Sequence, residues 1–86
     1  MALESLKSQV SLIGSMKVQC LSRGHSFYLD LKEKEGGNDE GMCPGEALLS
    51  ALGGCKCMVA QNVAKQMNIK FSNLTIELEA EYDPKG

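Results

Sequence analysis

The chain has 86 residues, of which 43% are hydrophobic, and its 9 basic and 11 acidic side chains leave a net charge of −2. This composition is typical of a single small globular domain over residues 1–86, and the length is too short for two. The acidic balance and the scattered lysines exclude binding driven by nucleic-acid phosphates. No apolar run approaches the roughly 20 residues that cross a bilayer, so we expect neither a membrane span nor a signal peptide. The expected compartment is the cytoplasm, where cysteines stay reduced.

Two segments near the N-terminus alternate apolar and polar side chains, which is the period of a β-strand. The first covers residues 10–21 and forms either one long strand or two short ones, because Gly14 marks a point where a bend or bulge is tolerated. The second covers residues 25–32, with Ser26, Tyr28 and Asp30 on the face opposite its apolar residues. The turn-like tripeptide of residues 22–24 separates them, so the pattern predicts a hairpin.

A long helix is expected after a polar, glycine-rich loop at residues 33–42, which is itself a candidate lid. Pro44 suits the first turn of a helix, since its missing N–H would have no partner there. Apolar residues then follow at spacings of three and four: Leu48, Leu52, Cys55, Val59, Val63 and Met67. The pair Gly53-Gly54 interrupts this helix, which predicts that another backbone or a substrate comes close there. Asn68 is expected to end it.

The cleanest strand pattern lies after the helix, where residues 74–82 alternate apolar positions with mostly acidic ones. Residues 83–86 read as a turn of the kind that opens another hairpin. The predicted fold class is therefore α+β, with antiparallel N-terminal strands, one long central helix and a further strand. Three strands leave the helix incompletely covered, so we expect an intertwined homodimer.

One block of the sequence resembles the OsmC/Ohr family. It consists of the glycine-rich loop at residues 36–41, then Pro44-Gly45-Glu46-Ala47-Leu48-Leu49, then Ala51-Leu52-Gly53-Gly54-Cys55. Proteins of this family are thiol-dependent peroxidases that reduce organic hydroperoxides and hydrogen peroxide, and they fold as intertwined α+β homodimers. The resemblance implies a stress-response oxidoreductase that uses no cofactor and takes a small-molecule peroxide and a dithiol reductant as partners. The chain looks like the N-terminal portion of the family's domain.

The resemblance places the chemistry at Cys55, which matches the family's attacking cysteine. In that reaction the thiolate displaces one oxygen of the peroxide and becomes a sulfenic acid. The family stabilises the thiolate with an arginine, and Arg23 is the only arginine of this chain, although its place does not clearly match. Glu46 matches the acid of the family's Pro-x-Glu-Leu-Leu variant, and it either orients Arg23 or faces the positive end of the helix dipole.

The family's resolving cysteine belongs to a later helix that these residues do not include, so another thiol of the chain would have to take that role. Cys57 points roughly 200° away from Cys55 on a helix, which disfavours a disulfide. Cys43 lies near the helix N-cap, where the dipole stabilises a thiolate, and is a candidate substitute. Cys20 reads as a buried structural thiol.

Two other functions compete with the peroxidase. The first is a catalytically silent OsmC-fold relative or fragment acting as a dimeric structural module, because a cysteine on an apolar helix stripe is ordinarily a core residue. The second is a metal site built from the cysteines and His25. A Cys-x-Cys pair on a helix diverges instead of chelating, so no metal is expected.

Overall fold

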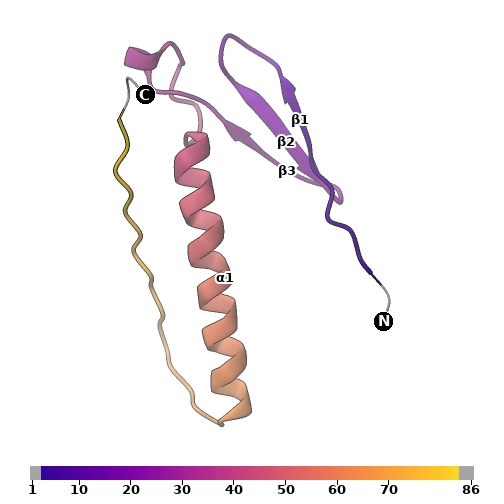
Figure 1. The fold of residues 1–86 in the computed structure, drawn as a ribbon, viewed down its shortest axis with the longest axis vertical. Coiled ribbons are helices and arrows are strands. Elements are labelled where there is room, and N and C mark those ends of the chain that lie inside the picture. Colours follow the sequence, from indigo (N-terminus) through magenta and orange to yellow (C-terminus); the bar gives the residue numbers. More distant parts are fainter. Residues whose placement is uncertain (1–2, 84–86) are drawn as a thin grey trace. The chain divides into compact units, whose positions relative to one another are not determined.

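The computed structural model describes residues 3–83 and shows an α+β arrangement, which confirms the predicted fold class (Figure 1). Its elements are β1 (Gln9–Leu12), β2 (Val18–Ser22), β3 (His25–Leu29), the short 3₁₀ helix η1 (Glu33–Glu35) and α1 (Pro44–Gln66). The chain divides into two compact units, Met1–Pro44 and Gly45–Gly86. The sheet belongs to the first unit and nearly all of α1 to the second.

The three strands form one antiparallel sheet in the order β1-β2-β3. Of the two alternatives for residues 10–21, the pair of short strands is the one observed, with bends at residues 14–16 between them. Cys20 lies on the central strand opposite Val10 and Phe27, and only 6% of its surface is exposed. This confirms that it is a buried thiol.

The predicted β2–β3 hairpin is confirmed, and its turn consists of Arg23 and Gly24. Both have positive φ, 51° and 82°. Two positive φ values in a two-residue loop are the signature of the turn whose twist matches that of the flanking strands. Strand β3 ends at Leu29, earlier than the expected Lys32, because the backbone leaves the ladder at Asp30 to form a loop.

The helix α1 begins at Pro44, as predicted, and runs for 23 residues. Its end is also as predicted, because Asn68 adopts a left-handed conformation with φ 56°. The amide of Ile69 donates to the carbonyl of Ala64 at 2.8 Å and that of Asn68 to Lys65 at 3.3 Å. This pair of bonds is a Schellman motif, which satisfies carbonyls that the last turn leaves without partners.

The segment after α1 does not form the predicted strand. Residues 69–83 are extended, but the structure assigns none of them to a strand. The period-two pattern was therefore right about the backbone and wrong about the pairing, because a strand needs a neighbour to share its hydrogen bonds and none of residues 3–83 supplies one. The expected turn at 83–86 lies, apart from Asp83, outside the described residues.

The apolar stripe of α1 is exposed to solvent within this chain, in line with the expectation that three strands leave the helix incompletely covered. Its members are between 45% and 65% exposed: Leu48, Leu52, Val59, Val63 and Met67. The extended segment runs back beside α1 (Figure 1), and Leu78 approaches the helix at Gly53, which is not part of the stripe. Among residues 3–83, no helix combines the length and apolarity needed to cross a membrane.

Candidate functional site: the thiols of helix α1

Cys55 lies on α1 directly after Gly53 and Gly54, and its side chain is exposed. The two glycines differ in their surroundings. A Cβ on Gly53 would come within 2.6 Å of a terminal methyl of Leu78, whereas a Cβ on Gly54 would meet nothing within 4 Å. A close approach therefore exists at Gly53, but it is made by the side chain of Leu78 and not by the backbone or substrate that was predicted.

A groove of about 480 Å³ runs between this face of α1 and the returning segment. Its walls combine apolar side chains, two glycines, one thiol and two polar residues: Glu46, Leu49, Ser50, Gly53, Gly54, Cys57, Ile76 and Leu78. Cys57 lines the groove and Cys55 does not. The two thiols therefore have different environments, one at the wall of an apolar groove and one open to solvent.

Helix geometry explains which residues share the groove. With about 3.6 residues per turn, Glu46 and Cys57 are 11 positions apart and lie on the same side, about 20° from alignment. Glu46 and Cys55 are 9 positions apart, which places them on roughly opposite sides and about 13 Å apart along the axis. Within one helix, then, Glu46 does not reach the thiol of Cys55.

Arg23, the expected partner of the thiolate, lies in the β2–β3 turn of the first unit. It lines a shallow surface groove with Lys7 and several serines, and it forms no ion pair with any residue of 3–83. Cys55 and Glu46 belong to the second unit. His25 begins β3 and is exposed. No group of three or more cysteine, histidine or acidic side chains within the described ranges is arranged to hold a metal ion.

The helix also separates Cys55 from the two thiols, Cys43 and Cys57, that could act as its resolving partner. Cys57 is turned roughly 200° away on α1. Cys43 directly precedes Pro44, which is about 16 Å from Cys55 along the helix axis. A disulfide needs Cα atoms within about 7 Å, which excludes Cys43, and Cβ atoms that point toward each other, which excludes Cys57. Neither cysteine can therefore pair with Cys55 of the same chain while the helix is intact.

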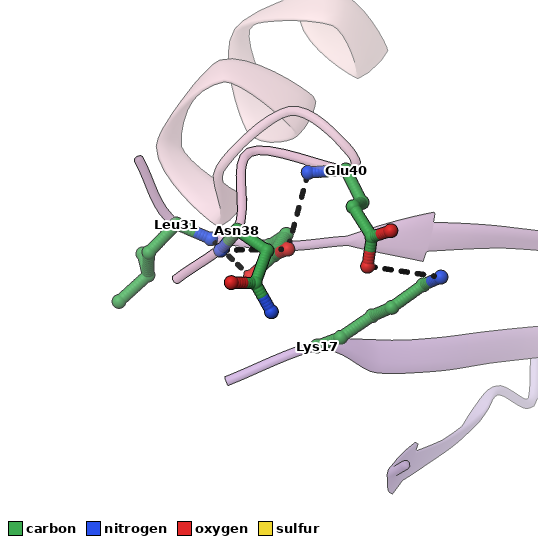
Figure 2. Close-up of polar contacts among 5 residues, drawn as sticks. Lys17, Leu31, Asn38 and Glu40 are labelled. Atoms are coloured by element: carbon green, nitrogen blue, oxygen red, sulfur yellow. Dashed lines mark hydrogen bonds and ion pairs between the residues drawn. The ribbon is translucent and has the colours of Figure 1, made fainter. Parts of the chain in front are cut away.

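Sequence reasoning missed Asp30, which it placed on the polar face of a strand. Only 2% of its surface is exposed. Its carboxylate accepts hydrogen bonds from the amides of Leu31 at 2.7 Å, Asn38 at 3.3 Å and Glu40 at 3.1 Å (Figure 2). Burial acts to raise the pKa of this carboxyl, but the three amides and the positive charge of Lys17 outweigh it and hold the pKa below its ordinary value.

Comparison with known protein families gives one match, which includes α1 and its cysteines. A family described as OsmC-like protein matches residues 36–86, which is more than half of the chain. The chain belongs to the OsmC-like family. No curated protein and no solved structure matches it. The matched range includes the second half of the loop, all of α1 and the returning segment, and it begins after Arg23 and Asp30.

Membership of the OsmC-like family indicates a peroxiredoxin-type or stress-related protein. Cys55, Cys57, Cys43 and Glu46 all fall within the matched range, whereas Cys20 and Arg23 lie outside it. Of the three cysteines in the matched range, Cys55 is the exposed one.

Proposed function

We propose that this OsmC-like protein is a thiol peroxidase that reduces organic hydroperoxides or hydrogen peroxide through Cys55. The observation that supports the proposal is an exposed thiol on α1, placed directly after two glycines and inside the range that matches the family. Gly54 has no side chain and open space around it, so a small substrate can approach the backbone beside the sulfur.

The first half-reaction needs only the thiolate and the peroxide. The sulfur of Cys55 attacks the terminal peroxide oxygen, an S–O bond forms and the O–O bond breaks. The sulfur loses two electrons and becomes a sulfenic acid, and the leaving alkoxide or hydroxide takes a proton to give alcohol or water. Nothing in this step requires a metal or an organic cofactor.

The second half-reaction returns the sulfenic acid to the thiol, and we assign it to a dithiol reductant. One thiol of the reductant attacks the sulfur of Cys55, releasing water and forming a mixed disulfide. The second thiol of the reductant then attacks that disulfide and releases Cys55 as a thiol. This route suits the helix geometry, because neither Cys43 nor Cys57 reaches Cys55 within one chain.

The active form in this proposal is a homodimer. The stripe that carries Cys55 also carries Leu52 and Val59, which are 50% and 57% exposed. A continuous apolar stripe of this kind on a small domain is unfavourable in water and is characteristic of an interface. A second copy lying on this stripe would shield Cys55 and would bring other residues to it, and Arg23 and Glu46 of the partner chain are the candidates for stabilising the thiolate.

Peroxide consumption by cysteine variants tests the proposal. The protein, Cys55→Ser and Cys57→Ser are each supplied with a dithiol and cumene hydroperoxide, and the remaining peroxide is measured over time. We expect Cys55→Ser to abolish turnover and Cys57→Ser, two residues away on another side of the same helix, to retain it. Equal loss in both variants would contradict the assignment, and no turnover in the unaltered protein would favour the silent structural module.

A further inference from the structure

The loop that joins β3 to α1 is closed on itself by backbone hydrogen bonds. The amide of Asp30 donates to the carbonyl of Met42 at 3.2 Å, which joins the two ends of the loop. Inside it, the amide of Asp39 donates to Leu31 at 2.9 Å and that of Gly37 to Lys32 at 3.0 Å. A glycine-rich composition is typical of a mobile lid, but here the loop is fastened at its base and across its middle.

The carboxylate of Asp30 lies at the centre of this loop. One oxygen accepts from Leu31 on the outgoing side, and the other accepts from Asn38 and Glu40 on the returning side. Figure 2 shows the three bonds converging, with Glu40 also reaching Lys17 at 3.5 Å. Asp30 is the buried charged residue of the described part of the chain. A buried carboxylate is tolerated only with such donors, so the charge and the loop conformation depend on each other.

Two glycines allow the loop to pack this tightly. A Cβ on Gly37 would collide with the carbonyl of Leu31 and would lie 2.6 Å from a carboxylate oxygen of Asp30. A Cβ on Gly41 would lie 2.7 Å from the carbonyl of Tyr28. The returning side of the loop therefore rests directly on backbone and carboxylate, with no side chain between them.

We propose that Asp30 is a positioning residue for the thiol of Cys43. Met42 is paired with Leu29 and receives the hydrogen bond of the Asp30 amide, and Cys43 is the next residue, partly buried at the start of α1. The carboxylate holds the returning side of the loop in place and thereby fixes how far the Cys43 sulfur is open to a reagent. This role goes beyond the proposed peroxidase and needs no reaction at Cys55.

The test is the alkylation rate of each cysteine by iodoacetamide, followed by peptide mass spectrometry, in Asp30→Asn and Asp39→Asn. An asparagine at position 30 presents an N–H₂ group to amides that need an acceptor, so at least one bond is lost. Asp39→Asn makes the same charge change on the same loop at an exposed residue whose positive φ suits asparagine. We expect Asp30→Asn to accelerate alkylation of Cys43 about fivefold, the factor that corresponds to one hydrogen bond, and Asp39→Asn to leave it unchanged.

Cys20 serves as the internal reference, because it is buried in the sheet of the same unit. Faster alkylation of Cys43 with Cys20 still protected supports the positioning role. An unchanged Cys43 rate overturns it, and so does equal acceleration of Cys20, which would mean that Asp30 acts on the whole unit. If Asp30→Asn does not fold, Gly37→Ala perturbs the same loop with the carboxylate in place. Acceleration of Cys43 in that variant supports the proposal, and an unchanged rate overturns it.

Discussion

Replacing each glycine of the Gly53-Gly54 pair with alanine tests how the returning segment packs on α1. Alanine is favoured over glycine in a helix interior by about 1 kcal/mol. Gly54 has open space around it, so Gly54→Ala gains this amount in full. For a domain of this size, about 1 kcal/mol raises the melting temperature by roughly 4–8 °C.

Gly53→Ala gains the same helix propensity but places a methyl group 2.6 Å from the Cδ1 atom of Leu78. Forcing an extra methyl into a packed site costs about 1–3 kcal/mol, and the half-buried, flexible end of Leu78 places this site at the lower limit. The two terms then nearly cancel. We expect Gly53→Ala to melt close to the unaltered protein, about 1 kcal/mol below Gly54→Ala.

Thermal melts followed by circular dichroism measure the melting temperature of both variants. The same two substitutions are then repeated in a protein that also carries Leu78→Ala. With the leucine shortened, Gly53→Ala has no methyl to meet and should stabilise as much as Gly54→Ala does, which a double-mutant cycle isolates. Equal stabilisation by the two alanines in the presence of Leu78 would refute the packing of this segment on Gly53. A loss of stability in Gly54→Ala alone would show that another surface covers that glycine.

Three further predictions follow from the geometry. Because the pKa of Asp30 is lowered in the folded state, the ionised carboxylate contributes its full stabilisation above the ordinary carboxyl pKa of 3.8, and this stabilisation is lost as the pH falls through the folded-state pKa. Acid denaturation should therefore show a loss of stability below about pH 4, and Asp30→Asn should lack this loss. Peroxide treatment should give no disulfide between Cys55 and either Cys57 or Cys43 of the same chain, as non-reducing peptide maps would reveal; such a bond would mean that α1 unwinds. Asn68→Ala should lower the free energy of unfolding by about 1 kcal/mol, because alanine disfavours the left-handed backbone conformation of residue 68, and Asn68→Gly should not lower it.

The local elements were predictable because their signals are local. Pro44 and Asn68 mark the ends of α1 through the missing N–H of one and the left-handed preference of the other. The β2–β3 turn was visible from Gly24, since glycine adopts positive φ without strain. The spacing of apolar residues likewise gave the length of the helix.

The sequence did not show which parts of the chain pack against each predicted element. Residues 74–82 alternate as a strand does, yet pairing depends on a neighbouring strand that periodicity does not reveal. The stripe of α1 gave the apolar face that stays open, but no spacing showed that the segment after the helix returns along a different face. Asp30 looked like a solvent-facing strand residue, because nothing in its spacing shows that three distant amides converge on it. An aspartate directly before a loop rich in glycine and asparagine was the available signal.

Trapping of sulfenic acid tests the central claim most directly. The protein is treated with one equivalent of cumene hydroperoxide and a sulfenic-acid trap, and all four cysteines are mapped by mass spectrometry. The account predicts an adduct at Cys55 alone, with Cys57 unmodified on the other side of the same helix and Cys20 protected in the sheet. An adduct at Cys57 in place of Cys55, or none at any cysteine, would contradict it.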